Sequence, residues 1–193
     1  MKIRDQVGFT IAELLVASAI SVIVCAAVAI MTSSVSVNIR VLENAAGIAN
    51  QGRTNIELIS RDIRQASHVL TSYGSYTTAD DVLILQVASI NATGDVIDPK
   101  TLFDVMVYTK DAAYPHTLQR VVYAGSSSYR TSGSATHPGN IKTLYFSWNG
   151  VGLGSVADES YVDIVTVRIV TSATVLGVET TSELVTNATL RNR

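Results

Sequence analysis

The amino-acid sequence predicts an α+β fold in which a long N-terminal helix packs on a mostly antiparallel β-sheet domain. Three observations lead to this prediction. An almost uninterrupted apolar run fills residues 9–31, apolar residues then recur at three- and four-residue steps through residues 32–70, and short β-branched or aromatic runs occupy residues 80–193. The first two patterns favour helices, and the third is typical of strands. An amphipathic helix must cover its apolar face, and a sheet beside it can do so.

The apolar run over residues 9–31 is long enough to cross a membrane. As a helix it would extend about 34 Å, more than a hydrocarbon core of about 30 Å. Lys2 and Arg4 precede it, so we expect the N-terminus in the cytoplasm and the chain beyond about Thr32 outside. Because the apolar core of a secretory signal peptide is shorter, we expect this segment to be retained.

Residues 32–70 are expected to continue the helix as an amphipathic segment. The charges of residues 55–67 fall mainly opposite its apolar stripe, and two oppositely charged pairs, Arg53–Glu57 and Glu57–Arg61, are four residues apart. Gly47 and Gly52 each weaken a helix by about 1 kcal/mol relative to alanine, so they predict a bend or a soft point. The apolar stripe consists of Leu42, Ala45, Ala49, Ile56, Ile59, Ile63, Ala66 and Leu70.

The second half of the chain predicts strands separated by polar loops. The longest loop, residues 124–140, is rich in Gly and Ser, and we expect it to be mobile or to form an interaction surface. Asn149 and Gly150 predict a tight turn. The predicted strands are residues 82–87, 102–109, 118–124, 141–148, 161–171 and 182–190.

Composition argues against several classes of function. A net charge of −2 over 193 residues, with no long basic run, is unlike a nucleic-acid surface. The single cysteine, Cys25, allows no internal disulfide. His68, His116 and His137 have no metal-ligand spacing, and the sequence contains no GxSxG motif. We therefore expect no cofactor, no bound metal and no catalytic activity.

Glu13 is an acid at the front of the apolar run. A carboxylate costs about 2.5–3.5 kcal/mol at the centre of a bilayer and less near its interface. One interpretation is that the interface tolerates the acid, which also favours the positive end of its own helix. The other is that it pairs with a cationic amine exposed at Phe9 by cleavage after Gly8, either its own or that of a neighbouring helix.

Small residues follow Glu13 along the apolar run at steps of four. Small side chains let membrane helices approach closely, although the high Ala and Ser content of the segment explains the row equally well. The row consists of Ala17, Ser21, Cys25 and Ala29.

The stretch "GFTIAELLVA", residues 8–17, resembles the class III signal of type IV pilins and type II secretion pseudopilins. This resemblance implies that a prepilin peptidase removes residues 1–8 by cutting after Gly8 and methylates Phe9. It also implies that Glu13 neutralises the N-terminal amine of an adjacent subunit during filament assembly.

The helix-plus-sheet pattern further along is similar to that of the larger minor subunits of this family, pseudopilins of the J type and minor pilins of the W type. We expect a minor pseudopilin that helps to initiate or stabilise a type II secretion pseudopilus near its tip. A minor pilin of a type IV or DNA-uptake pilus is one alternative, and a single-span membrane-anchored binding protein or enzyme is another. The expected partners are the prepilin peptidase, other pilin or pseudopilin subunits and the inner membrane, with the sheet domain periplasmic or extracellular.

Overall fold

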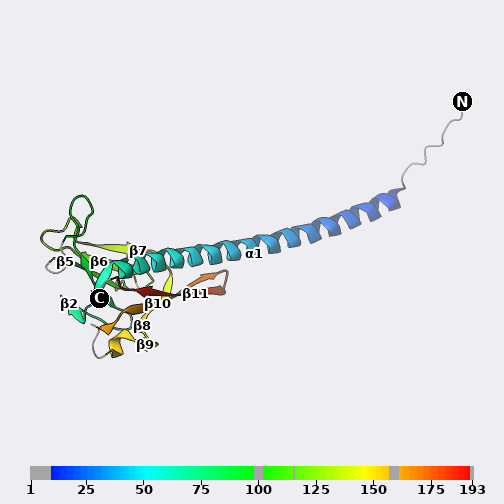
Figure 1. Cartoon of the computed structure of the whole chain (residues 1–193). Coiled ribbons are helices and arrows are strands. Elements are labelled where there is room, and N and C mark those ends of the chain that lie inside the picture. The colour runs from blue at the N-terminus through cyan, green and yellow to red at the C-terminus, as the bar shows by residue number, and fades with distance from the viewer. Residues whose placement is uncertain (1–9, 98–101, 115, 157–160, 192–193) are drawn as a thin grey trace. The chain divides into compact units, whose positions relative to one another are not determined.

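Helix α1 (Ile11–Gln65) is the first element of the described residues and is followed by antiparallel sheets, so the expected α+β layout is confirmed (Figure 1). The structure is a computed structural model that describes residues 10–97, 102–114, 116–156 and 161–191. The chain divides into two units, Met1–Glu43 and Asn44–Arg193. Helix α1 runs through the boundary between them, and it passes both Gly47 and Gly52 without interruption.

In the first unit, α1 is exposed on every side from Ile11 to Arg40. Proline and glycine are absent from this stretch, and hydroxyl groups bond to carbonyls one turn back, as Ser21 does to Ala17 at 2.8 Å. This is the one helix of the described residues that is long and apolar enough to cross a membrane.

In the second unit, α1 buries the predicted stripe, with Ile56, Ile59 and Ile63 all inaccessible or nearly so. The prediction that the helix continues to residue 70 is wrong, because α1 ends at Gln65 and Ala66–Val69 forms strand β1. A bulge between Ala66 and His68 lets both Ala66 and Val69 reach the core. The predicted stripe ended on Leu70, which is half-buried. Ala66 and Leu70 have the four-residue spacing of a helix, although the backbone from Ala66 to Val69 is already a strand.

Two antiparallel sheets and a small hairpin complete the second unit. The five-stranded sheet has the order β1-β4-β5-β6-β7, the four-stranded sheet has the order β11-β10-β8-β9, and β2 pairs with β3. The strand bounds are β2 Ser72–Tyr73, β3 Tyr76–Thr77, β4 Leu83–Ala88, β5 Phe103–Lys110, β6 Leu118–Tyr123, β7 Gly133–His137, β8 Ile141–Trp148, β9 Val151–Gly152, β10 Ile164–Val175 and β11 Val178–Thr189, and a short 3-10 helix, η1, spans Leu153–Ser155.

Each of the six predicted strands has a counterpart; β8 has the predicted ends, and the other five have shifted ends. The largest shift occurs because β10 and β11 meet in a hairpin whose turn, Leu176–Gly177, has φ angles of 52° and 83°. The predicted turn at Asn149 and Gly150 is confirmed, with φ angles of 50° and 80° between β8 and β9. The predicted loop over residues 124–140 is partly wrong, because β7 lies within it and pairs with β6.

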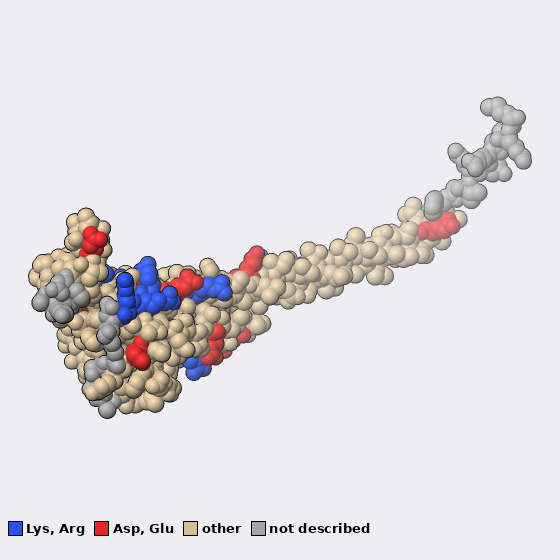
Figure 2. Space-filling model, viewed as in Figure 1, with Lys and Arg blue, Asp and Glu red and all other residues tan. Residues whose placement is uncertain are grey.

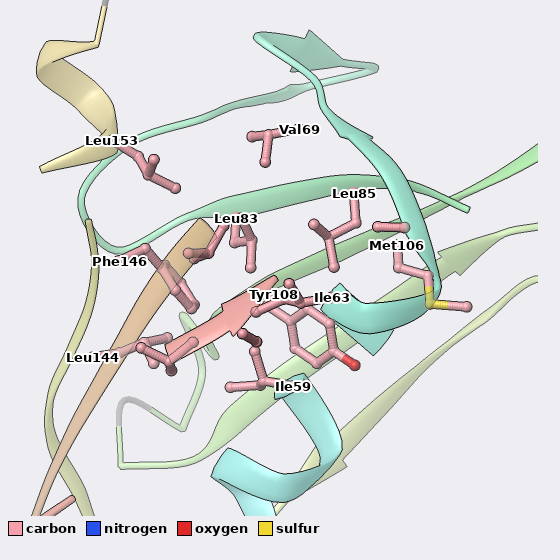
Figure 3. Close-up of a cluster of buried hydrophobic side chains, with 14 of the residues drawn as sticks. Ile59, Ile63, Val69, Leu83, Leu85, Met106, Tyr108, Leu144, Phe146 and Leu153 are labelled. Atoms are coloured by element: carbon pink, nitrogen blue, oxygen red, sulfur yellow. The ribbon is translucent and has the colours of Figure 1, made fainter. Parts of the chain in front are cut away.

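The helix and both sheets share one core. Figure 3 shows Ile59 and Ile63 of α1 beside Leu85 and Tyr108 of the five-stranded sheet and Phe146 of the four-stranded sheet. A smaller cluster on the five-stranded sheet consists of Ile84, Val105, Val107 and Val121, with Tyr76 of β3 packed against it. Burial of such side chains contributes about 1.5–3 kcal/mol each, so this core fixes the second half of α1 on the sheets.

Candidate assembly site

The first turn of α1 is closed by two reciprocal bonds between Thr10 and Glu13. The backbone N–H of Thr10 donates to Oε2 of Glu13 at 2.9 Å, and the N–H of Glu13 donates to Oγ1 of Thr10 at 3.3 Å. The Thr10 hydroxyl also donates to Oε2 at 3.0 Å. This is a capping box, in which an N-terminal Thr and a Glu three residues later satisfy each other's backbone donors. Glu13 therefore stabilises the start of its own helix.

The same geometry leaves Glu13 accessible to a partner. Both bonds that the carboxylate accepts end on Oε2, and within residues 10–97 and the other described ranges no bond to Oε1 is recorded. The side chain is exposed. Beside it runs a shallow groove lined by Ala12, Glu13, Val16, Ala17 and Ile20. A free oxygen next to a groove of small and aliphatic side chains suits contact with another helix.

The other residues predicted for this site fall into two groups, one on α1 and one outside the described residues. Ala17, Ser21, Cys25 and Ala29 all lie exposed on α1. Figure 2 shows mostly uncharged side chains on the visible face of this part of the helix. Gly8 and Phe9, the predicted cleavage and methylation positions, lie outside the described residues.

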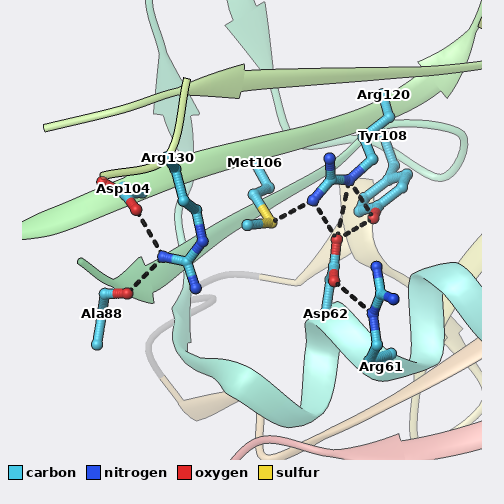
Figure 4. Close-up of polar contacts among 8 residues, drawn as sticks. All are labelled: Arg61, Asp62, Ala88, Asp104, Met106, Tyr108, Arg120 and Arg130. Carbon is cyan, nitrogen blue, oxygen red and sulfur yellow. Dashed lines mark hydrogen bonds and ion pairs between the residues drawn. The ribbon is translucent and has the colours of Figure 1, made fainter. Parts of the chain in front are cut away.

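A buried ionic cluster joins α1 to the five-stranded sheet, and the sequence did not reveal it. Arg120 of β6 lies 2.8 Å from Asp62, and the hydroxyl of Tyr108 donates to the same carboxylate at 2.5 Å (Figure 4). Burial, the charge of Asp62 and its hydrogen bond raise the pKa of Tyr108, although Arg120 opposes this, so the phenol stays protonated. Asp62 is three residues from Ile59, which was the available signal that it shares the buried face.

The oppositely charged residues that lie four apart on α1 are not paired with each other in the part of the chain that the structure describes. Among the described residues, neither Arg53–Glu57 nor Glu57–Arg61 forms an ion pair, and Arg61 instead contacts Asp62 at 3.4 Å.

A second buried carboxylate, Asp104, fixes part of the predicted loop. It accepts bonds from Arg130, from the Gly125 N–H, from Ser128 and from Ser89 at distances of 2.5–2.8 Å (Figure 4 shows the arginine). Burial by itself raises the pKa of Asp104, but these four hydrogen bonds together hold it below the usual value of an aspartate. The segment between β6 and β7 is therefore tied to β5 by a buried anion.

The described residues form no candidate metal-binding group. No group of three or more His, Cys, Asp or Glu side chains in these ranges is placed to hold a metal ion. Comparisons of the chain with protein-family models, with curated proteins and with solved structures find no match. The likeness to pilins and pseudopilins therefore rests on residues 8–17 and on a helix-plus-sheet layout that is compatible with theirs.

Proposed function

We propose that this chain is a minor pseudopilin, a structural subunit that is built into a type II secretion pseudopilus near its tip. One arrangement supports the proposal above all. An apolar helical segment, Ile11 to Arg40, is exposed on every side among the described residues and carries an exposed carboxylate, Glu13, on its first turn. Such a helix requires either lipid or other apolar helices around it. In this proposal the membrane provides the lipid before assembly, and the filament core provides the helices afterwards.

In the proposed sequence of events, prepilin peptidase cuts after Gly8 while the helix spans the inner membrane. The new amine at Phe9 is then methylated and keeps a positive charge. Glu13 of the incoming subunit approaches the Phe9 amine of a subunit already in place, with Oε1 free to accept it. An unpaired carboxylate among packed apolar helices costs several kcal/mol, so only the axial position that joins acid and amine is stable.

The second unit has a mechanical rather than a catalytic role in this proposal. It stays outside the membrane, where it faces neighbouring minor subunits or cargo. Its five-stranded sheet is joined to α1 by the buried Asp62 cluster. A pull or push along this part of the helix would therefore act on the folded unit.

Mass spectrometry of the N-terminus tests the class of function. Chain purified from host membranes should begin with a methylated Phe9. An intact Met1 in cells with an active prepilin peptidase would contradict the proposal and would favour a membrane-anchored binding protein or enzyme that acts alone.

Cross-linking tests the assembly step. The test uses the double substitution Thr10→Cys/Ala12→Cys in a Cys25→Ser background. Disulfides between the two introduced cysteines of different subunits should form in isolated filaments and not in dispersed precursor. If none form, Glu13 does not lie near a foreign N-terminus.

Co-purification of partner subunits identifies the system. Secretion pseudopilins in the same filament support the proposal, whereas a major pilin and a retraction ATPase would assign the chain to a type IV or DNA-uptake pilus.

A further inference from the structure

The two large sheets have four edges, and three of them are short or interrupted. β1 has four residues and contains a bulge, and β7 has five residues and is followed directly by Pro138. β9 covers only two residues of β8, and further along β8 the N–H groups of Phe146 and Ile141 donate to the carbonyls of Asp80 and His116. Short strands, bulges and prolines are the features that keep a sheet edge from pairing with another chain. These three edges are therefore protected.

The fourth edge, β11, has none of these protections. Its twelve residues pair with β10 in one unbroken register from Ile164–Thr189 to Val175–Val178. The strand contains no proline and no lysine. Within the described ranges, its backbone pairs with β10 alone, so every second residue directs an N–H and a C=O away from the sheet. A long regular edge of this kind is a template for one more strand.

A pocket lies beside this edge, on the side of the sheet that faces α1. It has a volume of about 250 Å³ and is lined by Ala46, Ala49, Asn50 and Arg53 of α1 and by Leu184 of β11. The helix comes close here because Gly52 has no side chain; a Cβ at that position would lie 2.9 Å from Leu184 Cδ1. The pocket walls are mostly small or apolar, which suits an aliphatic side chain.

A positively charged side chain, that of Arg53, lines the same pocket. Arg53 is exposed, and among the described residues no ion pair or hydrogen bond of its side chain is recorded. It is placed to meet an acidic side chain on whatever enters the pocket.

We propose that β11 and this pocket bind an extended segment of a different protein chain, which adds a fifth strand to the four-stranded sheet. Main-chain hydrogen bonds to β11 provide the affinity, as in other cases of strand addition. An aliphatic side chain of the segment fills the pocket against Leu184, and a neighbouring Asp or Glu pairs with Arg53. The site lies wholly within the second unit, so it does not depend on Glu13 or on filament assembly.

Photo-cross-linking in host cells tests the proposal on the full-length chain. Benzoylphenylalanine is introduced singly at Thr180, Ser182 and Thr186, which share the α1-facing side of β11, and the cross-linked peptides are sequenced. In a paired strand, moving the probe by two or four residues should move the attachment point by the same number along one segment of one partner. Attachment points without this order, attachment to a second copy of the chain, or no attachment would overturn the proposal.

Matched variants separate pairing from general contact. Thr186→Lys places a charge on the side of β11 that faces α1, and its control, Asn187→Lys, places the charge on the opposite side of the strand. Arg53→Glu reverses the charge at the pocket. Its control, Arg64→Glu, reverses a charge on an exposed part of α1 away from the pocket lining. We expect Thr186→Lys and Arg53→Glu to reduce the Ser182 cross-link at least fivefold, with unchanged melting temperature, and the two controls to preserve it. Equal effects of both members of a pair would refute the proposed geometry. The Glu13→Ala background, which should block assembly, must retain the cross-link.

Discussion

Asp62 and Arg120 form an ion pair across the core, with Oδ2 and Nη2 2.8 Å apart and side chains that are 3% and 21% exposed. The pair joins α1 to β6, and Tyr108 adds β5 to the same carboxylate. Such an arrangement is costly to disrupt on one side only, because the remaining charge stays buried without its partner.

We therefore predict that Asp62→Ala lowers the free energy of unfolding by about 3–5 kcal/mol. The measurement is urea unfolding of the full chain in detergent, followed by tryptophan fluorescence. Arg64→Ala is the matched control, since Arg64 is exposed on the same helix and has no recorded ion pair among the described residues, and it should change stability by less than about 0.5 kcal/mol. In the double variant Asp62→Leu/Arg120→Met, part of the loss should be recovered. A single-variant loss as small as that of the control would show that the pair does not hold the helix.

The second buried carboxylate, Asp104, predicts that the free energy of unfolding depends on pH. The pKa of Asp104 is held below its usual value in the folded chain, so the unfolded state binds the proton more tightly. The stabilisation from this group is complete above the unfolded pKa of about 4 and is lost as the pH falls through the lower, folded pKa. Unfolding curves between about pH 2 and pH 6 should therefore show a decline that is shallower in Asp104→Asn. An identical decline in both proteins would assign it to other groups.

Periodicity in the sequence predicted most elements of this fold, because each helix or strand leaves a local pattern. The prediction failed where two patterns coincide. Ala66 and Leu70 continue the helical spacing of the apolar stripe, yet α1 ends at Gln65 and Ala66–Val69 is a strand. It also failed at β7, whose residues Gly133–His137 are polar and mostly exposed, so that only pairing with β6 makes them a strand.

The two glycines of α1 provide a third prediction. Helix propensity assigns both the same weakening effect, but no atom lies within 4 Å of a Cβ at Gly47, whereas a Cβ at Gly52 would meet Leu184 at 2.9 Å and Thr171 at 3.2 Å. Gly47→Ala should raise the unfolding free energy by up to about 1 kcal/mol. Gly52→Ala should be at least about 1 kcal/mol less stable than Gly47→Ala, because Thr171 is β-branched and cannot move aside easily. Equal stabilities would mean that the sheet yields at this contact.

At the candidate site, too, features that lie within one stretch of sequence could be predicted, whereas contacts between distant residues could not. The GFTIAELLVA motif is contiguous, so it could be found by inspection. Asp62 and Arg120 are 58 residues apart, and their meeting depends on sheet order. The free edge of β11 is likewise a property of topology, since the sequence of a strand does not state which neighbours it has.

Glu13 closes the capping box with Thr10, and we propose that it also pairs with a foreign amine. Substitution can separate the observed role from the proposed one. Thr10→Val removes the hydroxyl that the Glu13 N–H bonds to but keeps the carboxylate, so the helix start should weaken by about 1 kcal/mol while assembly continues. Glu13→Gln keeps an oxygen that can accept the Thr10 N–H bond but removes the charge. It should be cleaved after Gly8 and yet enter filaments at least tenfold less often, measured by immunoblotting of sheared filaments against total membrane protein. The opposite order, with Thr10→Val impaired and Glu13→Gln normal, would assign the acid to its own helix alone.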